Sequence, residues 1–261
     1  MPTRCAPLIM KTILVVRKYD NFSRILAANS FDVINFPLIE TKAADDLSEF
    51  DAKLDAIKNY DGVFLTSRTA AEIFRAKLVE KKLNYCGRVY ILGRRSYKIL
   101  KAENLNLFFD ETANTAREML EKIALEDLTD KNFLFVRGEK SLRVIPDFLS
   151  KKSSVDEAIV YRTENLTVEK NEVEIIGAKI KRNEVFGACF FSPSAAESFT
   201  KLFGVDILHQ TIIAAIGRST AEFFRKQKLK VGFVSSKAAA EDFAVQLIED
   251  FKGRLSANKH G

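Results

Sequence analysis

The sequence predicts an α/β protein made of two similar, doubly wound lobes with parallel sheets. Short apolar runs rich in Val, Ile and Phe alternate with amphipathic stretches of helical length, which is typical of parallel strands crossed by helices. The order of these elements recurs after about 120–125 residues, which indicates a tandem duplication. The 261 residues are enough for two domains of ordinary size.

The first repeat begins with the β-rich run Thr12–Arg17 and a helix over Asp20–Ala28, for which Asp20 or Asn21 is the expected cap. Its other strands are expected at Phe31–Phe36, Gly62–Thr66, Arg88–Leu92 and Leu105–Phe109. Its other helices are expected at Leu47–Lys58, Thr69–Lys81, Arg94–Ala102 and Asn114–Ala124. Pro37 interrupts this pattern, and we expect the following Leu38–Lys42 to be an extended connector.

The second repeat begins with Asn132–Arg137, which echoes the first strand. Its other strands are expected at Asp156–Tyr161, Phe186–Phe191, Thr211–Ile216 and Lys230–Val234. Its helices are expected at Ser141–Lys151, Val168–Lys181, Ser194–Leu202, Ser219–Gln227 and Ala239–Asp250. The alternation predicts sheets with helices on both faces.

Two divisions into domains are compatible with the duplication. The chain could divide sequentially near Asp130. Alternatively, two extended stretches could be paired connector strands between the lobes, because both lack Gly/Ser linker character. The sequence favours this second division, with lobe 1 formed by 11–36 plus 165–252, lobe 2 by 44–156, connectors at 37–43 and 157–164, and disordered tails at 1–10 and 253–261.

The most similar parts of the repeats are corners where a strand ends and a helix begins. Leu65–Phe74 aligns without a gap with Phe190–Phe199, so that Ser67 matches Ser192. In open α/β sheets ligands bind at such corners, outside the carboxyl ends of the strands. Free N–H groups at helix starts also favour anions. The corners therefore predict small anion sites.

Capping patterns divide the hydroxyl groups of these corners into two kinds. Thr69, Ser194 and Ser219 each stand three residues before a glutamate, which is the spacing of a capping box, so we interpret them as helix caps. Ser67 and Ser192 then have no structural role and remain as candidate ligand contacts. Further hydroxyl groups nearby belong to Thr66 and Thr220.

Glycines and arginines stand at equivalent points of the repeats. Gly93-Arg94 and Gly217-Arg218 each follow a strand and open a helix, where glycine permits close approach to a ligand and arginine can bind a carboxylate. Arg17 and Arg137 end the matching first strands. A solvated strand end is the structural alternative for each arginine. Neither glycine corner matches a nucleotide-binding motif.

Composition argues against several classes of protein. The net charge of +6 suits a small polyanionic ligand, but the basic residues are scattered and do not form the stripe typical of a nucleic-acid binder. No apolar stretch reaches membrane-spanning length, and residues 1–10 are too short for a signal peptide. His209 and His260 fit neither a Ser–His–Asp triad nor a metal site. The three cysteines lack metal-ligand spacing, and Cys189 is expected to be a buried thiol in a reducing cytoplasm.

Several motifs together resemble the uroporphyrinogen-III synthase family. Their order and spacing carry the resemblance, which extends from about Lys11 to Phe251. The motifs are Ile13–Arg17, Phe36–Thr41, Gly62–Ser67, Phe135–Gly138, Val160–Thr163, Phe191–Ala195 and Ile216–Ala221.

The resemblance implies two α/β lobes joined by a two-stranded connector, with the first lobe discontinuous. It implies a cleft between the lobes that binds hydroxymethylbilane, a linear tetrapyrrole with many carboxylates. The implied reaction is cyclisation to uroporphyrinogen III with inversion of the last pyrrole ring and loss of water, without cofactor or metal. We therefore expect a cytoplasmic, monomeric lyase of heme biosynthesis with no nucleic-acid or membrane partner.

The resemblance also implies roles for single residues. Tyr161 matches the family's connector tyrosine, proposed there to help the hydroxyl group leave; a packed aromatic side chain is the structural alternative. Arg68 and Arg218 stand where the family often has proline, which alters the expected corners. The complete set of predicted substrate-binding residues is Arg17, Thr66, Ser67, Gly93, Arg137, Ser192, Ser194, Gly217, Arg218, Ser219 and Thr220.

Two other functions remain open from the sequence. A non-enzymatic two-lobed binder of a small polyanion would share the corners and the connector but leave hydroxymethylbilane unchanged. A nucleic-acid-binding α/β protein would explain the positive charge, and its retention on DNA or RNA would depend on salt.

Overall fold

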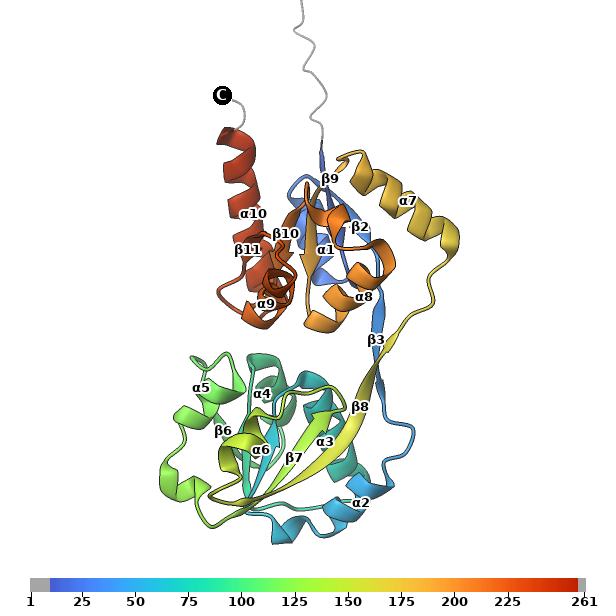
Figure 1. Ribbon diagram of the computed structural model, residues 1–261. Coiled ribbons are helices and arrows are strands. Elements are labelled where there is room, and N and C mark those ends of the chain that lie inside the picture. Colours follow the sequence, from blue (N-terminus) through green and yellow to red (C-terminus); the bar gives the residue numbers. More distant parts are fainter. Residues whose placement is uncertain (1–9, 258–261) are drawn as a thin grey trace, which may run out of the picture. The chain divides into compact units, whose positions relative to one another are not determined.

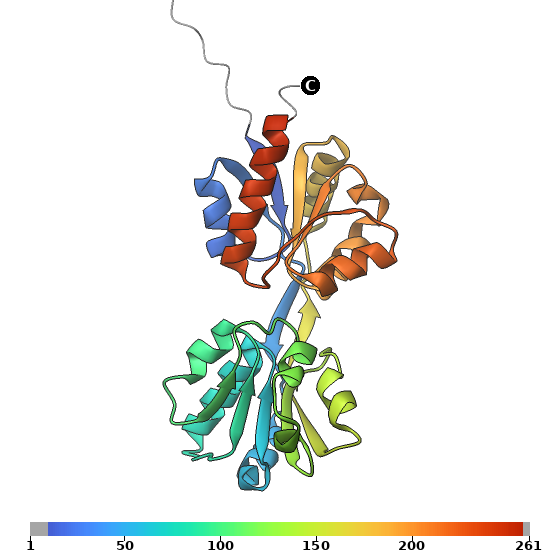
Figure 2. The ribbon, with the colours of Figure 1, turned by 90° about the vertical axis from the view of Figure 1, so that its left-hand side faces the viewer.

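The computed structural model describes residues 10–257, which divide into two compact units (Figures 1 and 2). Unit 1 comprises the described residues up to Glu40 and those from Asn165 onward. Unit 2 comprises Thr41–Glu164. The chain passes from one unit to the other within strands β3 (Ile39–Ala43) and β8 (Ser154–Asn165), which are neighbours in one sheet.

Unit 1 contains a five-stranded sheet in the order β11-β10-β9-β1-β2, with every neighbouring pair parallel. Its strands are β1 (Lys11–Val15), β2 (Phe31–Asn35), β9 (Val185–Phe190), β10 (Ile212–Ala215) and β11 (Val231–Val234). Its helices are α1 (Asn21–Ala28), α7 (Lys170–Lys181), α8 (Pro193–Phe203), the 3₁₀ turn η3 (Asp206–Leu208), α9 (Arg218–Lys226) and α10 (Ala240–Ala257).

Both faces of the unit 1 sheet are buried, as its apolar runs predict. Leu14 and Val16 pack against the residues of α7, α8 and α9. Ile13 and Val15, whose side chains alternate with these, pack against α1 and α10 on the other face. Figure 2 shows the two groups of helices on opposite sides of the strands.

Unit 2 contains a six-stranded sheet in the order β3-β8-β7-β4-β5-β6. Its remaining strands are β4 (Gly62–Leu65), β5 (Arg88–Ile91), β6 (Asn106–Phe109) and β7 (Asn132–Gly138). Its helices are α2 (Ser48–Asp55), η1 (Ile57–Asn59), α3 (Arg68–Glu80), α4 (Arg94–Leu100), α5 (Ala116–Glu121), η2 (Leu125–Leu128) and α6 (Val144–Leu149).

The unit 2 sheet is also covered on both faces. Val63 and Leu65 pack with α2, α3 and α4, whereas Phe64 packs with α5 and α6. Phe64 stacks on Tyr90 with ring centroids 4.6 Å apart, so the second face is largely aromatic. The predicted doubly wound α/β architecture is thereby confirmed for each unit.

Several predicted elements differ in their bounds from the structure. The strand expected at Asp156–Tyr161 is longer, because β8 continues to Asn165. The helix expected at Ser141–Lys151 begins only at Val144, because Pro146 lacks an N–H donor and is accommodated in the first turn of α6. The tail expected to be disordered from residue 253 continues as α10 to Ala257, where Leu255 packs against the unit 1 core and Arg254 donates to the Gly232 carbonyl at 2.9 Å. Residues 1–9 and 258–261 lie outside the described residues.

Among the helices within residues 10–257, none is both long and apolar enough to span a membrane.

Candidate active site

Each sheet has a switch point, where successive connections leave in opposite directions along the sheet. In unit 1 it lies between β1 and β9, because α1 covers one face and α8 the other. In unit 2 it lies between β7 and β4, with α6 and α3 on opposite faces. At each switch point one strand ends near an arginine and its neighbour leads into a serine corner, Arg17 beside Ser192 and Arg137 beside Ser67.

The two serines at these corners are the N-caps of their helices. Ser67 has an extended backbone, and its hydroxyl oxygen accepts a hydrogen bond from Ala70 N at 3.1 Å. Ser192 does the same for Ala195 N, also at 3.1 Å. Each hydroxyl keeps its own proton available for an acceptor, and the first-turn N–H groups beside it have no partner within the helix. Both corners can therefore donate hydrogen bonds to an anion.

This geometry corrects the predicted caps. Thr69 and Ser194 are each the second residue of their helix, two residues after the N-cap. Ser219 is likewise the second residue of α9, whose N-cap is Gly217. The capping role therefore belongs to the serine corners, which the sequence pattern left without a structural role.

Arg17 leaves β1 at the switch point of unit 1. Its guanidinium forms an ion pair with Asp20 at 2.9 Å and lies 4.2 Å from the ring centroid of Phe191, the residue before Ser192. Val16 N donates to the Cys189 carbonyl at 3.0 Å, which holds the ends of β1 and β9 together. The structure thus brings a cation and the Ser192 corner to one edge.

The third corner of unit 1 adds residues of unequal accessibility. Gly217 lies between β10 and α9 in an extended backbone, with Arg218 and Ser219 exposed after it. Ile216 N donates to the Phe190 carbonyl at 3.0 Å, which places this corner next to that of Ser192. Thr220 is only 1% exposed on the buried face of α9, so its burial does not favour the predicted substrate contact.

Unit 2 presents a comparable edge along β8, β7, β4 and β5. Thr66 and Ser67 follow β4, and Leu92 N donates to the Leu65 carbonyl at 3.0 Å, which joins this corner to the next. Gly93 caps α4 with a φ of +88°, a left-handed conformation that favours glycine. A Cβ there would have no neighbour within 4 Å, so this glycine is required by backbone conformation rather than by space.

The predicted substrate residue Arg137 is engaged by its own surroundings. Its Nε lies 2.6 Å from Glu157 Oε2, and both side chains are largely buried. Its Nη1 donates to the carbonyls of Gly138 and Glu139 at 2.9 and 3.0 Å. The guanidinium therefore fixes the turn after β7, and a contact of Arg137 with substrate stays a prediction.

Tyr161 lies next to this turn. In the pairing of β7 with β8, Gly138 is opposite Tyr161, and the partly buried ring packs onto the core of unit 2. A Cβ placed on Gly138 would be 2.4 Å from two ring atoms of Tyr161, so the ring lies directly over the glycine. The strand β7 that carries Gly138 pairs with β4, which leads to Ser67. Gly138 was not among the predicted site residues, although its position after an apolar run and an arginine could have indicated it.

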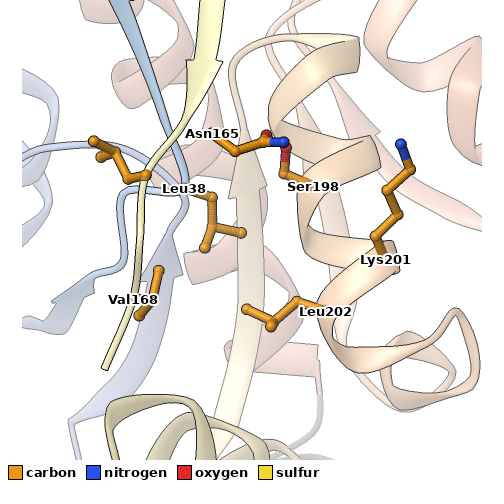
Figure 3. Close-up of a pocket in the computed structure, with 7 residues that line it drawn as sticks. Leu38, Asn165, Val168, Ser198, Lys201 and Leu202 are labelled. Carbon is orange, nitrogen blue, oxygen red and sulfur yellow. The ribbon is translucent and has the colours of Figure 1, made fainter. Parts of the chain in front are cut away.

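A cavity of about 240 Å³ lies along α8 in unit 1. Figure 3 shows Asn165 and Ser198 facing one another at its polar end, where Ser198 Oγ donates to Asn165 Oδ1 at 2.6 Å. Leu38 and Leu202 lie below them. None of the predicted substrate-binding residues lines this cavity, so it does not extend the candidate site.

The described residues offer limited acid–base and metal chemistry. Within residues 10–257, no group of three or more His, Cys, Asp or Glu side chains could hold a metal ion. Cys189 is buried, and its burial raises the pKa of the thiol well above its usual range. The candidate edges instead supply hydroxyl groups, a phenol, backbone N–H groups and guanidinium groups. These groups are suited to binding carboxylates and to stabilising a leaving hydroxyl group.

The fold and its edges define a two-unit, doubly wound α/β protein with a serine N-cap corner at the switch point of each unit. The family profile described as "Uroporphyrinogen-III synthase HemD" matches residues 20–244 of the chain. The chain belongs to the uroporphyrinogen-III synthase family.

Individual relatives agree with this assignment. A uroporphyrinogen-III synthase of Chlorobaculum parvum is 26% identical over 254 residues, which cover 93% of this chain and 100% of that protein. A crystal structure of a mutant uroporphyrinogen III synthase from the extremely thermophilic bacterium Thermus thermophilus has a TM-score of 0.65 at 16% identity, covering 95% of this chain and 99% of that one. The structure of uroporphyrinogen-III synthetase from Helicobacter pylori has a TM-score of 0.61 at 19% identity, covering 93% and 100%. At these identities the two solved structures support the fold alone.

Proposed function

We propose that the chain cyclises hydroxymethylbilane to uroporphyrinogen III, with inversion of the last pyrrole ring and loss of water, as a cofactor-independent lyase. Family membership supports the reaction. The observation that carries the proposal at the site is the repeated corner, a serine N-cap beside an arginine-ended strand at both switch points. The repeated corners supply several separate donor groups, as a ligand with many carboxylates requires.

The proposed chemistry needs little acid–base strength. The C–O bond of the hydroxymethyl group breaks, the hydroxyl leaves as water after gaining a proton, and the electron-rich pyrrole delocalises the resulting positive charge. Ring closure through a spiro intermediate releases a proton again, so that water is the net loss. Tyr161 donates a hydrogen bond to the leaving hydroxyl, and Ser67, Ser192 and the neighbouring N–H groups hold carboxylates. Orientation of the substrate then supplies most of the rate enhancement.

The test is to incubate the protein with enzymatically generated hydroxymethylbilane and to separate the type III from the type I isomer. We expect type III with the protein and type I, the spontaneous product, without it. Prior treatment with a chelator should leave the yield of type III unchanged. Formation of type I alone would refute the proposal, and tight binding of hydroxymethylbilane in that case would identify a non-enzymatic binder.

Tyr161→Phe is expected to lower kcat by about 10²-fold, because it removes the donor to the leaving hydroxyl group while keeping the ring. Tyr60→Phe is a matched control in the same unit, since the Tyr60 hydroxyl donates to Asp156 at 2.7 Å and is assigned no role with substrate. Equal rates for Tyr161→Phe and Tyr60→Phe would eliminate the role of Tyr161. A cytoplasmic location and a monomeric state remain predictions, the latter testable by sedimentation.

A further inference from the structure

We propose that Gly138 is a positioning residue for Tyr161: its missing side chain is the space in which the phenol lies. The inference rests on the proposed function for its catalytic consequence. Its structural part, the contact between this glycine and this ring, stands on the geometry of β7 and β8.

A bulge in β8 brings the ring over the glycine. Arg137 pairs with Ile159, but the next residue, Gly138, pairs with Tyr161, so that Val160 is the extra residue on β8. An extra residue reverses the side-chain alternation and re-aims the side chains after it. Ala158 and Val160 are buried in the core of unit 2, and Tyr161 packs at the margin of that core. Without the bulge, Val160 rather than Tyr161 would lie opposite Gly138.

The backbone beneath the ring is held from several sides. The Gly138 carbonyl accepts from Arg137 Nη1 at 2.9 Å and from Ser141 N at 3.1 Å. Gly138 N donates to Ser141 Oγ at 3.1 Å, and Glu139 N donates to the Tyr161 carbonyl at 2.9 Å. A backbone with this many hydrogen bonds cannot retreat without breaking some of them. Any added atom at residue 138 must therefore displace the ring.

The size of that displacement follows from the distances. A Cβ on Gly138 would lie 2.4 Å from Cε2 and Cζ of Tyr161 and 2.9 Å from its hydroxyl oxygen. Ordinary van der Waals contact starts at 3.4 Å, so the ring must move by about 1 Å, a misplacement that can lower a rate by about 10²-fold. The atoms that clash are at the far end of a flexible, partly buried side chain, so the ring can turn away while the protein folds.

Gly62→Ala provides a matched control. Gly62 is in β4 of the same sheet, and a Cβ there would lie 2.8 Å from the Tyr90 ring and 3.0 Å from that of Phe133. This substitution disturbs the sheet through other aromatic rings and does not touch Tyr161. It therefore separates a loss of stability from a loss of positioning.

Kinetics give the first readout. We expect Gly138→Ala to lower kcat by about 10²-fold, as Tyr161→Phe does, with KM little changed. The Gly138→Ala/Tyr161→Phe double variant should be no slower than Tyr161→Phe alone, because the hydroxyl that Gly138 positions is already gone. Gly62→Ala should retain its kcat below its unfolding temperature. Additive losses in the double variant, or an unchanged kcat in Gly138→Ala, would overturn the inference.

Fluorotyrosine labelling gives a second readout that does not require activity. The chain has six tyrosines, and the ¹⁹F signal of Tyr161 is the one missing in Tyr161→Phe. This signal should shift in Gly138→Ala and stay in place in Gly62→Ala. An unshifted signal would refute the contact even in an active enzyme, whereas a shifted signal in a protein that forms no type III isomer would refute only the proposed function.

A further variant covers the case in which Gly138→Ala does not fold. Adding Tyr161→Leu removes the ring that the new Cβ would meet, so Gly138→Ala/Tyr161→Leu should fold. A double variant that also fails to fold would show that something other than Tyr161 requires the glycine, and would overturn the inference.

Discussion

Replacing Ser192 by alanine tests which residue caps α8. The Ser192 hydroxyl accepts from Ala195 N at 3.1 Å, and this partly buried hydrogen bond is lost in Ser192→Ala. Because α8 packs through Ala195, Ala196 and Phe199, its first turn should stay packed in the variant. The N–H group of Ala195 then loses its hydrogen-bond acceptor. We expect a loss of about 1 kcal/mol in the free energy of unfolding.

Ser194→Ala is the control, because Ser194 is the residue that the capping-box pattern predicts as the cap. Its hydroxyl makes no cap hydrogen bond, so we expect a change of less than about 0.5 kcal/mol. The same comparison can be repeated in unit 2, where Ser67→Ala should be costly and Thr69→Ala should not.

Urea unfolding followed by circular dichroism measures both variants. With an m-value of about 2 kcal/mol per M, a loss of about 1 kcal/mol lowers the midpoint by roughly 0.5 M. The reasoning is refuted if Ser194→Ala lowers the midpoint more than Ser192→Ala does. Ser192→Asn should retain most of the stability, since asparagine is also a good N-cap.

Three further predictions concern ion pairs and thiols. Hydrogen bonds from Lys42 and Arg162 lower the pKa of Glu164 in the folded protein. The stabilisation from the ionised Glu164 is therefore present above its unfolded pKa near 4.5 and is lost as the pH falls through the lower folded pKa. The urea midpoint of Glu164→Gln should depend less on pH below 4.5 than that of the wild type, and parallel pH curves for the two proteins would contradict this. Under native conditions Cys86 should react with a thiol reagent and the buried Cys189 only after unfolding, so equal reaction rates in a Cys5→Ser background would contradict the packing. Arg254→Ala removes a two-point contact with Asp250 and should cost about 1 kcal/mol in urea unfolding, whereas no change would indicate that the last turns of α10 are not docked.

The sequence predicted the strands well because their apolar runs are short, uninterrupted and buried on both faces. β4, β5, β9 and β10 all lie within one residue of their expected bounds at each end. The predicted hydroxyl, glycine and arginine corners also fall at the carboxyl edges of the sheets, since the repeat and the parallel order place them there.

The predicted caps Thr69 and Ser194 were wrong, because the glutamates three residues after them form ion pairs on the helix surface. Glu72 pairs with Arg68 at 2.8 Å, and Glu197 pairs with Lys201 at 2.7 Å, both as neighbours one helical turn apart. A carboxylate engaged on the helix surface does not reach back to a cap. Each of these helices therefore begins two residues earlier than the capping-box spacing predicts.

The end of α10 and the position of Gly138 depend on contacts between distant segments, which a local sequence pattern does not predict. The polar residues near the end of α10 are ordered by Leu255 and by the Arg254 contact with the Gly232 carbonyl, a distant segment of the chain. The position of Gly138 under Tyr161 depends on a bulge in the pairing of two strands. Spacing in the sequence determines neither which strands pair nor in which register.

The discontinuity of unit 1 has a consequence for the order of folding. Leu14 of β1 pairs with Ala188 of β9, so the whole of unit 2 is synthesised between two adjacent strands of the unit 1 sheet. Closing so long a loop is entropically costly, whereas unit 2 is continuous and can bury its own core earlier. During translation, we expect β1 and β2 to lack the pairing of β1 with β9 until the C-terminal strands have been synthesised. We therefore expect unit 1, which carries the Arg17 and Ser192 edge, to be more exposed to aggregation during synthesis than unit 2.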